Sequence, residues 1–111
     1  MYLYIELWKA KSEWLDLSQK ERGDYMSQLG PAIEGLAKAG VEIVGWGLND
    51  AEIPYRGNYR YLAVWKMPDK GLVQQFEEAV EQAGWYKYFE QINVRGELLT
   101  PETVIGNMIK L

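Results

Sequence analysis

The sequence predicts an α+β domain in which a four-stranded antiparallel sheet carries two helices on one face. The chain has 111 residues, the usual size of one domain, so residues 1–111 are treated as a single domain. Segments with period-two alternation and segments with apolar residues three and four apart follow in the order strand, helix, strand, strand, helix, strand. Right-handed crossovers and a central hairpin then give the spatial strand order 4-1-3-2.

The N-terminal part supplies the first strand and the first helix. In residues 1–9 aliphatic side chains alternate with aromatic ones, as in a strand. Residues 12–17 are expected to form a connector. Ser18 and Glu21 have the spacing of a capping box that opens a helix, and Gly40 is a suitable C-terminal cap. Gly30-Pro31 in its middle predicts a kink or a short break.

The central part reads as two strands, residues 41–48 and 59–67, joined by the polar loop 49–58. Pro68-Asp69 ends the second of these strands and caps a helix that closes at Gly84.

The C-terminal part begins with an aromatic turn at residues 85–89, followed by a strand over residues 90–98. Thr100-Pro101 is a strong helix start, and it predicts a short apolar helix at the end of the chain.

The two faces of the predicted sheet differ in kind. We expect the aliphatic faces of the strands to contact the helices. The other face would then carry aromatic and polar side chains, namely Tyr2, Tyr4, Glu6, Trp8, Trp46, Tyr61, Trp65, Gln91, Asn93 and Arg95. An aromatic surface of this extent is larger than soluble monomers usually expose. We therefore expect a homodimer whose two sheets close face to face around an interior.

This order of elements is that of a ferredoxin-like unit, and with the run from Gly45-Trp46-Gly47 to Pro68-Asp69 the chain resembles the dimeric α/β-barrel superfamily. That superfamily includes antibiotic-biosynthesis monooxygenases, stress-responsive barrel proteins and haem-degrading monooxygenases. The resemblance covers nearly the whole chain and is strongest to uncharacterised bacterial families. It implies a dimeric barrel and no particular reaction. The chain departs from the haem degraders because it has no histidine to ligate iron.

Composition excludes several classes of site. The chain has no cysteine and no histidine, which rules out disulfides, thiolate metal sites and Ser-His-Asp triads. No dense carboxylate cluster predicts a hard-metal site, and no motif calls for an organic cofactor. The net charge of −4 disfavours nucleic-acid binding. We find no signal peptide and no membrane span, so cytoplasmic residence is the expectation.

The sharpest catalytic candidates are Glu6 and Arg95, which the predicted sheet places on adjacent strands and one face, with Gln91 and Asn93 beside them. A carboxylate held against a guanidinium in a dry cavity could orient a substrate or act as a base. The alternative is a structural ion pair beneath the dimer interface.

A second set of candidates would line a cavity for a planar ligand. The set consists of Tyr4, Trp8, Trp46, Tyr61 and Trp65, with Asn49 at the mouth. The aromatic residues could equally be interface residues, and Asn49 an ordinary turn residue.

These observations leave three hypotheses for function. The first is a homodimer that binds a small planar molecule in the cavity on the non-helical face. The second is a cofactor-independent monooxygenase or isomerase. The third has no ligand, with the aromatic face serving only as dimer core. Whether the protein is an enzyme stays open at this point.

Overall fold

The computed structural model covers residues 1–111 and confirms the predicted order of elements. The strands are β1 (Tyr2–Ala10), β2 (Glu42–Leu48), β3 (Tyr61–Met67) and β4 (Phe89–Glu97). The longer helices are α2 (Gln19–Ala39), α3 (Lys70–Gln82) and the C-terminal α5 (Pro101–Ile109). Single helical turns, α1 (Ser12–Leu15) and α4 (Trp85–Tyr88), replace the predicted connector and aromatic turn. None of the five helices has the length and apolar character that crossing a bilayer requires.

The helix ends follow the predicted signals. Ser18 and Glu21 form the reciprocal capping box of α2, and the Asp69 side chain accepts from Leu72 N at the start of α3. Gly40 ends α2 at a φ of 116°, a left-handed conformation that glycine adopts without steric cost. A kink or a short break was expected at Gly30-Pro31, and the break is absent, because α2 runs continuously through Pro31.

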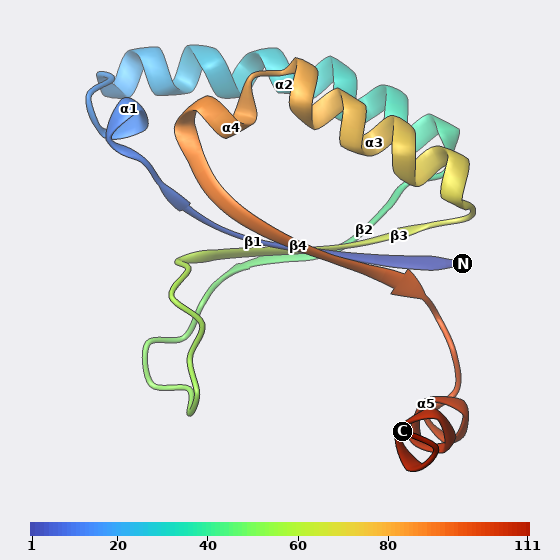
Figure 1. The fold of residues 1–111 in the computed structure, drawn as a ribbon. Helices are drawn as coiled ribbons and strands as arrows, with labels where there is room; N and C mark the ends of the chain where they lie inside the picture. Colours follow the sequence, from blue (N-terminus) through green and yellow to red (C-terminus); the bar gives the residue numbers. More distant parts are fainter.

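The sheet is antiparallel throughout, with the order β2-β3-β1-β4, which is the predicted order. Helices α2, α3 and α4 lie on one side of it, while α5 and the β2–β3 loop lie on the other (Figure 1). The fold is therefore the ferredoxin-like α+β fold with an additional C-terminal helix. A register shift between Ile43 and Gly45 marks a bulge in β2, the strand that contains Gly45 and Gly47.

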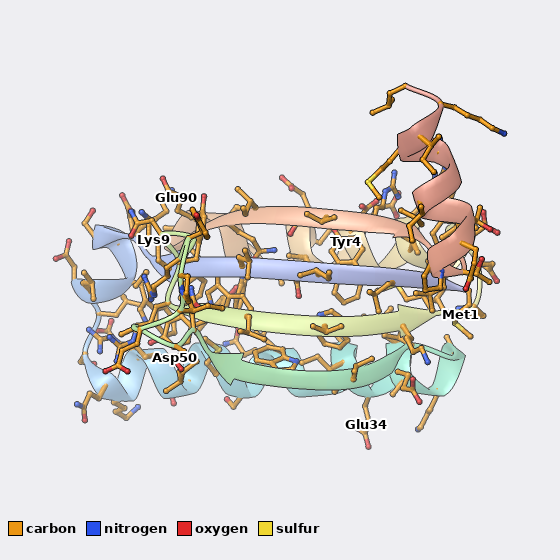
Figure 2. All side chains as sticks on the ribbon, turned by 90° about the horizontal axis from the view of Figure 1, so that it is seen from below. Met1, Tyr4, Lys9, Glu34, Asp50 and Glu90 are labelled. Carbon is orange, nitrogen blue, oxygen red and sulfur yellow. The ribbon has the colours of Figure 1, made fainter.

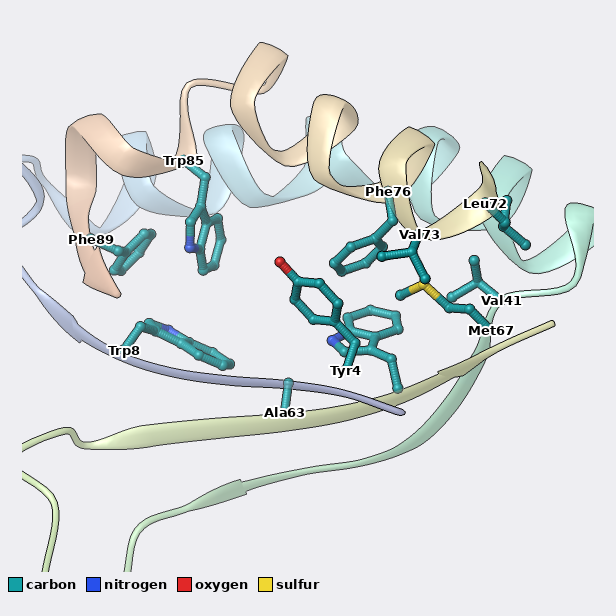
Figure 3. Close-up of a cluster of buried hydrophobic side chains, with 11 residues drawn as sticks. Tyr4, Trp8, Val41, Ala63, Met67, Leu72, Val73, Phe76, Trp85 and Phe89 are labelled. Carbon is teal, nitrogen blue, oxygen red and sulfur yellow. The ribbon is translucent and has the colours of Figure 1, made fainter. Parts of the chain in front are cut away.

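The assignment of the two sheet faces was wrong. The aromatic side chains of β1 and β3 point toward the helices and form the core (Figure 3). The buried hydrophobic residues are Tyr4, Trp8, Val41, Ala63, Trp65, Met67, Leu72, Val73, Phe76, Trp85 and Phe89. The aromatic face therefore cannot be the dimer core, and the cavity expected on the non-helical face must be sought beneath the helices. Large rings suit the space between the sheet and helices α2 and α3, because short side chains would not fill it.

The opposite face of the sheet is aliphatic and open. Its central rows follow from the strand register: Gly45, Val64, Ile5 and Val94 form one, and Gly47, Leu62, Leu7 and Ile92 form the next. Charged side chains flank these rows toward both ends of the strands. Lys9 pairs with Glu90 at 3.1 Å at one end, as Figure 2 shows, and Glu42 lies opposite Lys66 at the other.

Candidate functional site

A cavity of about 70 Å³ lies between the sheet and helices α2 and α3, partly open to solvent. Eleven of its twelve lining residues are hydrophobic, and the twelfth is Glu6. Trp46 and Trp65 line it from the sheet, and Phe76 and Trp85 line it from α3 and α4. The remaining lining residues come from α2, from α3 and from the C-cap of α3: Leu29, Ala32, Ile33, Leu36, Ala79, Val80 and Ala83. The site is thus an apolar, aromatic pocket with one carboxylate.

The strand register places the small Ala63 at the centre of this region. Trp46, Ala63, Glu6 and Asn93 form one cross-strand row on the helical face of the sheet. Ala63 is fully buried, and Figure 3 shows its methyl group directed toward the helices between larger side chains. Of this row, Trp46 and Glu6 line the cavity and Ala63 does not.

Glu6 is the only buried charged residue, with 6 % of its surface exposed. Its Oε1 accepts a hydrogen bond from Trp65 Nε1 at 2.7 Å, and its Oε2 accepts one from Gln91 Nε2 at 2.8 Å. Burial raises the pKa of Glu6, and these two hydrogen bonds oppose the increase. These two hydrogen bonds hold the carboxylate in a fixed orientation. Both donors are uncharged, so they do not neutralise its negative charge.

A short hydrogen-bond network fixes Gln91 in turn. Trp85 Nε1 donates to Gln91 Oε1 at 2.7 Å, and Gln91 Nε2 donates to Asn93 Oδ1 at 2.7 Å as well as to Glu6. Asn93 Nδ2 donates to the Tyr86 hydroxyl at 3.2 Å. Because the amide oxygen of Gln91 accepts from the indole N–H of Trp85, its amide nitrogen must face Glu6. The network therefore links the carboxylate to two of the tryptophans in the cavity wall.

The expected pairing of Glu6 with Arg95 is not formed. Arg95 Nη1 lies 3.2 Å from Glu77 Oε1 on α3, and the strand register places Arg95 beside Tyr4 rather than beside Glu6. The hydroxyl of Tyr4 is buried, which raises its pKa, and the nearby Glu77 carboxylate raises it further. Arg95 and Glu77 thus form an ion pair at the edge of the helical face.

The other predicted site residues divide into two places. Trp8 packs on Trp46, Tyr61 and Trp85 with centroid distances of 5.1, 5.7 and 5.7 Å, which extends the aromatic cluster beyond the cavity. Asn49 lies away from the cavity, where its Nδ2 donates to the carbonyls of Gly57 and Tyr59. Its observed role is that of a turn residue.

The sequence interpretation missed the helical wall of the site. The candidates named from the sequence include none of the residues from α3 and α4, such as Phe76, Val80 and Trp85. The sequence did contain a signal for Trp85. A buried indole N–H needs a polar partner, and Trp85 lies only six residues before Gln91.

A sequence profile described as "Family of unknown function (DUF6616)" matches residues 1–111, the full chain. No curated protein matches the sequence. Among solved structures, At3g17210 from Arabidopsis thaliana is similar with a TM-score of 0.62 and 8% identity, over 90% of this chain and 97% of that protein. A dabb family protein with a ferredoxin-like fold from Mesorhizobium loti has a TM-score of 0.52 and 9% identity, over 89% and 97% of the two chains.

A candidate chlorite dismutase, TA0507, is also similar, with a TM-score of 0.66 and 15% identity over 96% of this chain. The present chain spans only 48% of that protein. At these identities the likeness shows the fold alone. It confirms the expected ferredoxin-like fold, and the profile match confirms that the family is one of unknown function.

Proposed function

The chain belongs to this family of unknown function, and from the site itself we propose that it binds a small planar molecule between the sheet and helices α2 and α3. The observation that carries the proposal is the buried Glu6 carboxylate at the wall of an otherwise apolar cavity. Ligand pockets are typically apolar with a few placed polar groups. Trp46 and Trp65 offer flat faces, and Glu6 offers an acceptor that fixes orientation.

Binding can be tested through the indole N–H signals of the five tryptophans in two-dimensional NMR spectra. Phenol, benzaldehyde and 2-naphthol serve as planar probes. We expect at least one of them to shift the signals of Trp46, Trp65 and Trp85 while leaving Trp14 in place, because Trp14 packs on Tyr25 and Tyr88 and does not line the cavity.

A variant that fills the cavity provides the control. Ala79 lines the cavity and Ala37 does not, so Ala79→Leu should abolish the shifts and Ala37→Leu should retain them. Shifts that survive Ala79→Leu, or no response to any probe at millimolar concentration, would show that the cavity does not bind planar molecules.

A catalytic role is the second candidate, and the raised pKa of Glu6 favours it. A carboxylate with a pKa closer to neutrality is a better general base, as a cofactor-independent monooxygenase or isomerase would need. Once a ligand is known, Glu6→Gln separates the two functions. Retained binding with loss of turnover supports the enzyme, whereas a ligand that is never converted by the wild type supports a binding protein.

We further propose that the open aliphatic face is covered by a second copy of the chain. The exposed surface is 7832 Å², whereas a compact monomer of 12.9 kDa exposes roughly 6,300 Å². The excess of about 1,500 Å² is nearly twice the area, about 800 Å², that each partner contributes to a standard interface. The radius of gyration of 16.1 Å also exceeds the value of roughly 13 Å for a compact domain of this length.

Helix α5 contributes to this argument. It stands on the open side at the Met1 end of the sheet (Figure 2), and no hydrogen bond joins it to another helix or strand. Val104, Ile105, Met108 and Ile109 are between 45% and 78% exposed. An apolar central patch with charged ends has the anatomy of a protein interface, and α5 would extend it along a second copy.

The test is solution mass by sedimentation velocity. The wild type should be a dimer, and Val94→Lys at the centre of the open face should be a folded monomer. Gln28→Lys, which places the same charge on the exposed surface of α2, should remain dimeric. A monomeric wild type with native circular dichroism would refute the proposal that a second copy covers the open face.

A further inference from the structure

The one carboxylate of the cavity, Glu6, has no cationic partner in the protein. The ion pairs of the chain are Lys9 with Glu90, Lys20 with Asp24, and Arg95 with Glu77. None includes Glu6. A buried carboxylate without a counter-charge is costly, and hydrogen bonds from one indole and one amide offset only part of that cost.

The geometry leaves room for a further partner at Glu6. Each carboxylate oxygen can accept more than one hydrogen bond, and each Glu6 oxygen receives one from the protein. Glu6 also lines the cavity, so a ligand bound there would lie beside a carboxylate that can still accept hydrogen bonds.

The rings around the cavity add a second attraction for positive charge. Trp46 and Trp65 have centroids 5.7 Å apart and planes inclined at 73°, and Phe76 lies 4.9 Å from Trp65. Trp85 completes the wall. Aromatic faces attract cations, tryptophan most strongly, and the attraction grows when water is excluded. Cages of several aromatic rings are a known means of binding quaternary ammonium groups.

We propose that the ligand is a planar organic cation, such as a pyridinium or a protonated aromatic amine, with its charge between Glu6 and the tryptophan faces. The inference rests on the proposed function, since it assigns the chemistry of the same cavity. A planar cation satisfies both walls: its ring stacks on the indoles, and its charge compensates the carboxylate.

An isosteric pair of probes tests the charge alone. N-Methylpyridinium and toluene have the same shape and differ in one positive charge, and benzoate is a planar anion. Titrations followed by the indole N–H signals of Trp46, Trp65 and Trp85 give the dissociation constants. We expect N-methylpyridinium to bind tighter than toluene by on the order of tenfold, and benzoate to produce no shift.

Variants then locate the source of the preference. Glu6→Gln should reduce the ratio of the dissociation constants of toluene and N-methylpyridinium toward one. Glu77→Gln removes the same charge from a carboxylate that is already paired with Arg95, and should preserve the ratio. The comparison in the wild type stands on its own if Glu6→Gln does not fold.

The outcomes separate the two proposals. Toluene binding as tightly as N-methylpyridinium would overturn the cationic ligand and leave the planar-ligand cavity standing. A wild type in which neither of these probes, nor phenol, benzaldehyde or 2-naphthol, shifts the three signals would overturn both proposals. Tenfold preference that persists in a folded Glu6→Gln protein would show that the rings alone select the cation, and would refute the role of Glu6.

Discussion

The hydrogen bond between Trp65 and Glu6 allows a quantitative test of the buried carboxylate. Trp65 is 3 % exposed and its Nε1 lies 2.7 Å from Glu6 Oε1. In Trp65→Phe the ring remains aromatic but the donor is lost, so Glu6 keeps only the bond from Gln91. The variant also loses packing, and that loss does not depend on pH.

The pH-dependent part follows from the charge of Glu6. Burial raises its folded-state pKa above the ordinary value of 4.5, so in the wild type Glu6 favours folding below pH 4.5 and loses that contribution as the pH rises through the folded pKa. Loss of the Trp65 donor raises the pKa further. A hydrogen bond to a charged group contributes about 1.5–3 kcal/mol and one to a neutral group about 0.5–1.5 kcal/mol. The destabilisation by Trp65→Phe should therefore be larger at pH 8 than at pH 4 by about 1–1.5 kcal/mol.

The assay is urea denaturation of wild type and variant at several pH values and one protein concentration, because dimerisation would make stability depend on concentration. Trp14→Phe is the matched control. Trp14 is a half-buried indole that packs on Phe89 at 4.8 Å rather than on a carboxylate, so its effect should be the same at both pH values. A difference between Trp65→Phe and wild type that does not change with pH would refute an ionised Glu6 stabilised by Trp65.

Two further predictions concern the backbone and the C-terminal helix. Gly40→Ala should destabilise by about 1–2 kcal/mol in urea denaturation, and by more than Gly84→Ala. Both glycines have positive φ, but an added Cβ would lie 3.3 Å from Pro68 Cγ only at Gly40, so equal effects would contradict this reading. A chain ending at Thr100 should keep the far-ultraviolet signature of the sheet and dissociate more readily in sedimentation experiments, whereas an unchanged dimer would show that α5 lies outside the interface.

Local signals in the sequence were enough to predict the fold. Ser18, Asp69 and Thr100 cap the three longer helices as expected, and the period-two segments became the strands in the predicted order. The one-turn helices α1 and α4 were not predicted as helices, because four residues are too few for periodicity to show. Pro31 was expected to kink or break α2, and the break does not occur, because the helix continues through Pro31.

The site was harder to predict because both faces of the sheet are apolar. Alternation separates Tyr4, Glu6 and Trp8 from Leu3, Ile5 and Leu7, but it does not say which set the helices cover. The rings fill the deep space beneath α2 and α3, while the short aliphatic side chains form a flat surface of the kind that packs against another sheet. The sequence could predict that Glu6 and Gln91 lie on the same face of the sheet. The pairing of Arg95 with Glu77 could not be predicted, because it depends on where α3 lies over the sheet.

The exchange of faces has a consequence for binding. In the interior first expected, ligand and second copy would have occupied the same face, so dissociation of the dimer would have destroyed the cavity. In the structure the cavity lies under α2 and α3, and the open face lies on the other side of the sheet. N-Methylpyridinium should therefore bind a monomeric Val94→Lys protein as tightly as it binds the proposed wild-type dimer, measured by the same indole signals. Binding that is lost with the dimer would mean that the second copy holds α2 in place or completes the wall of the cavity.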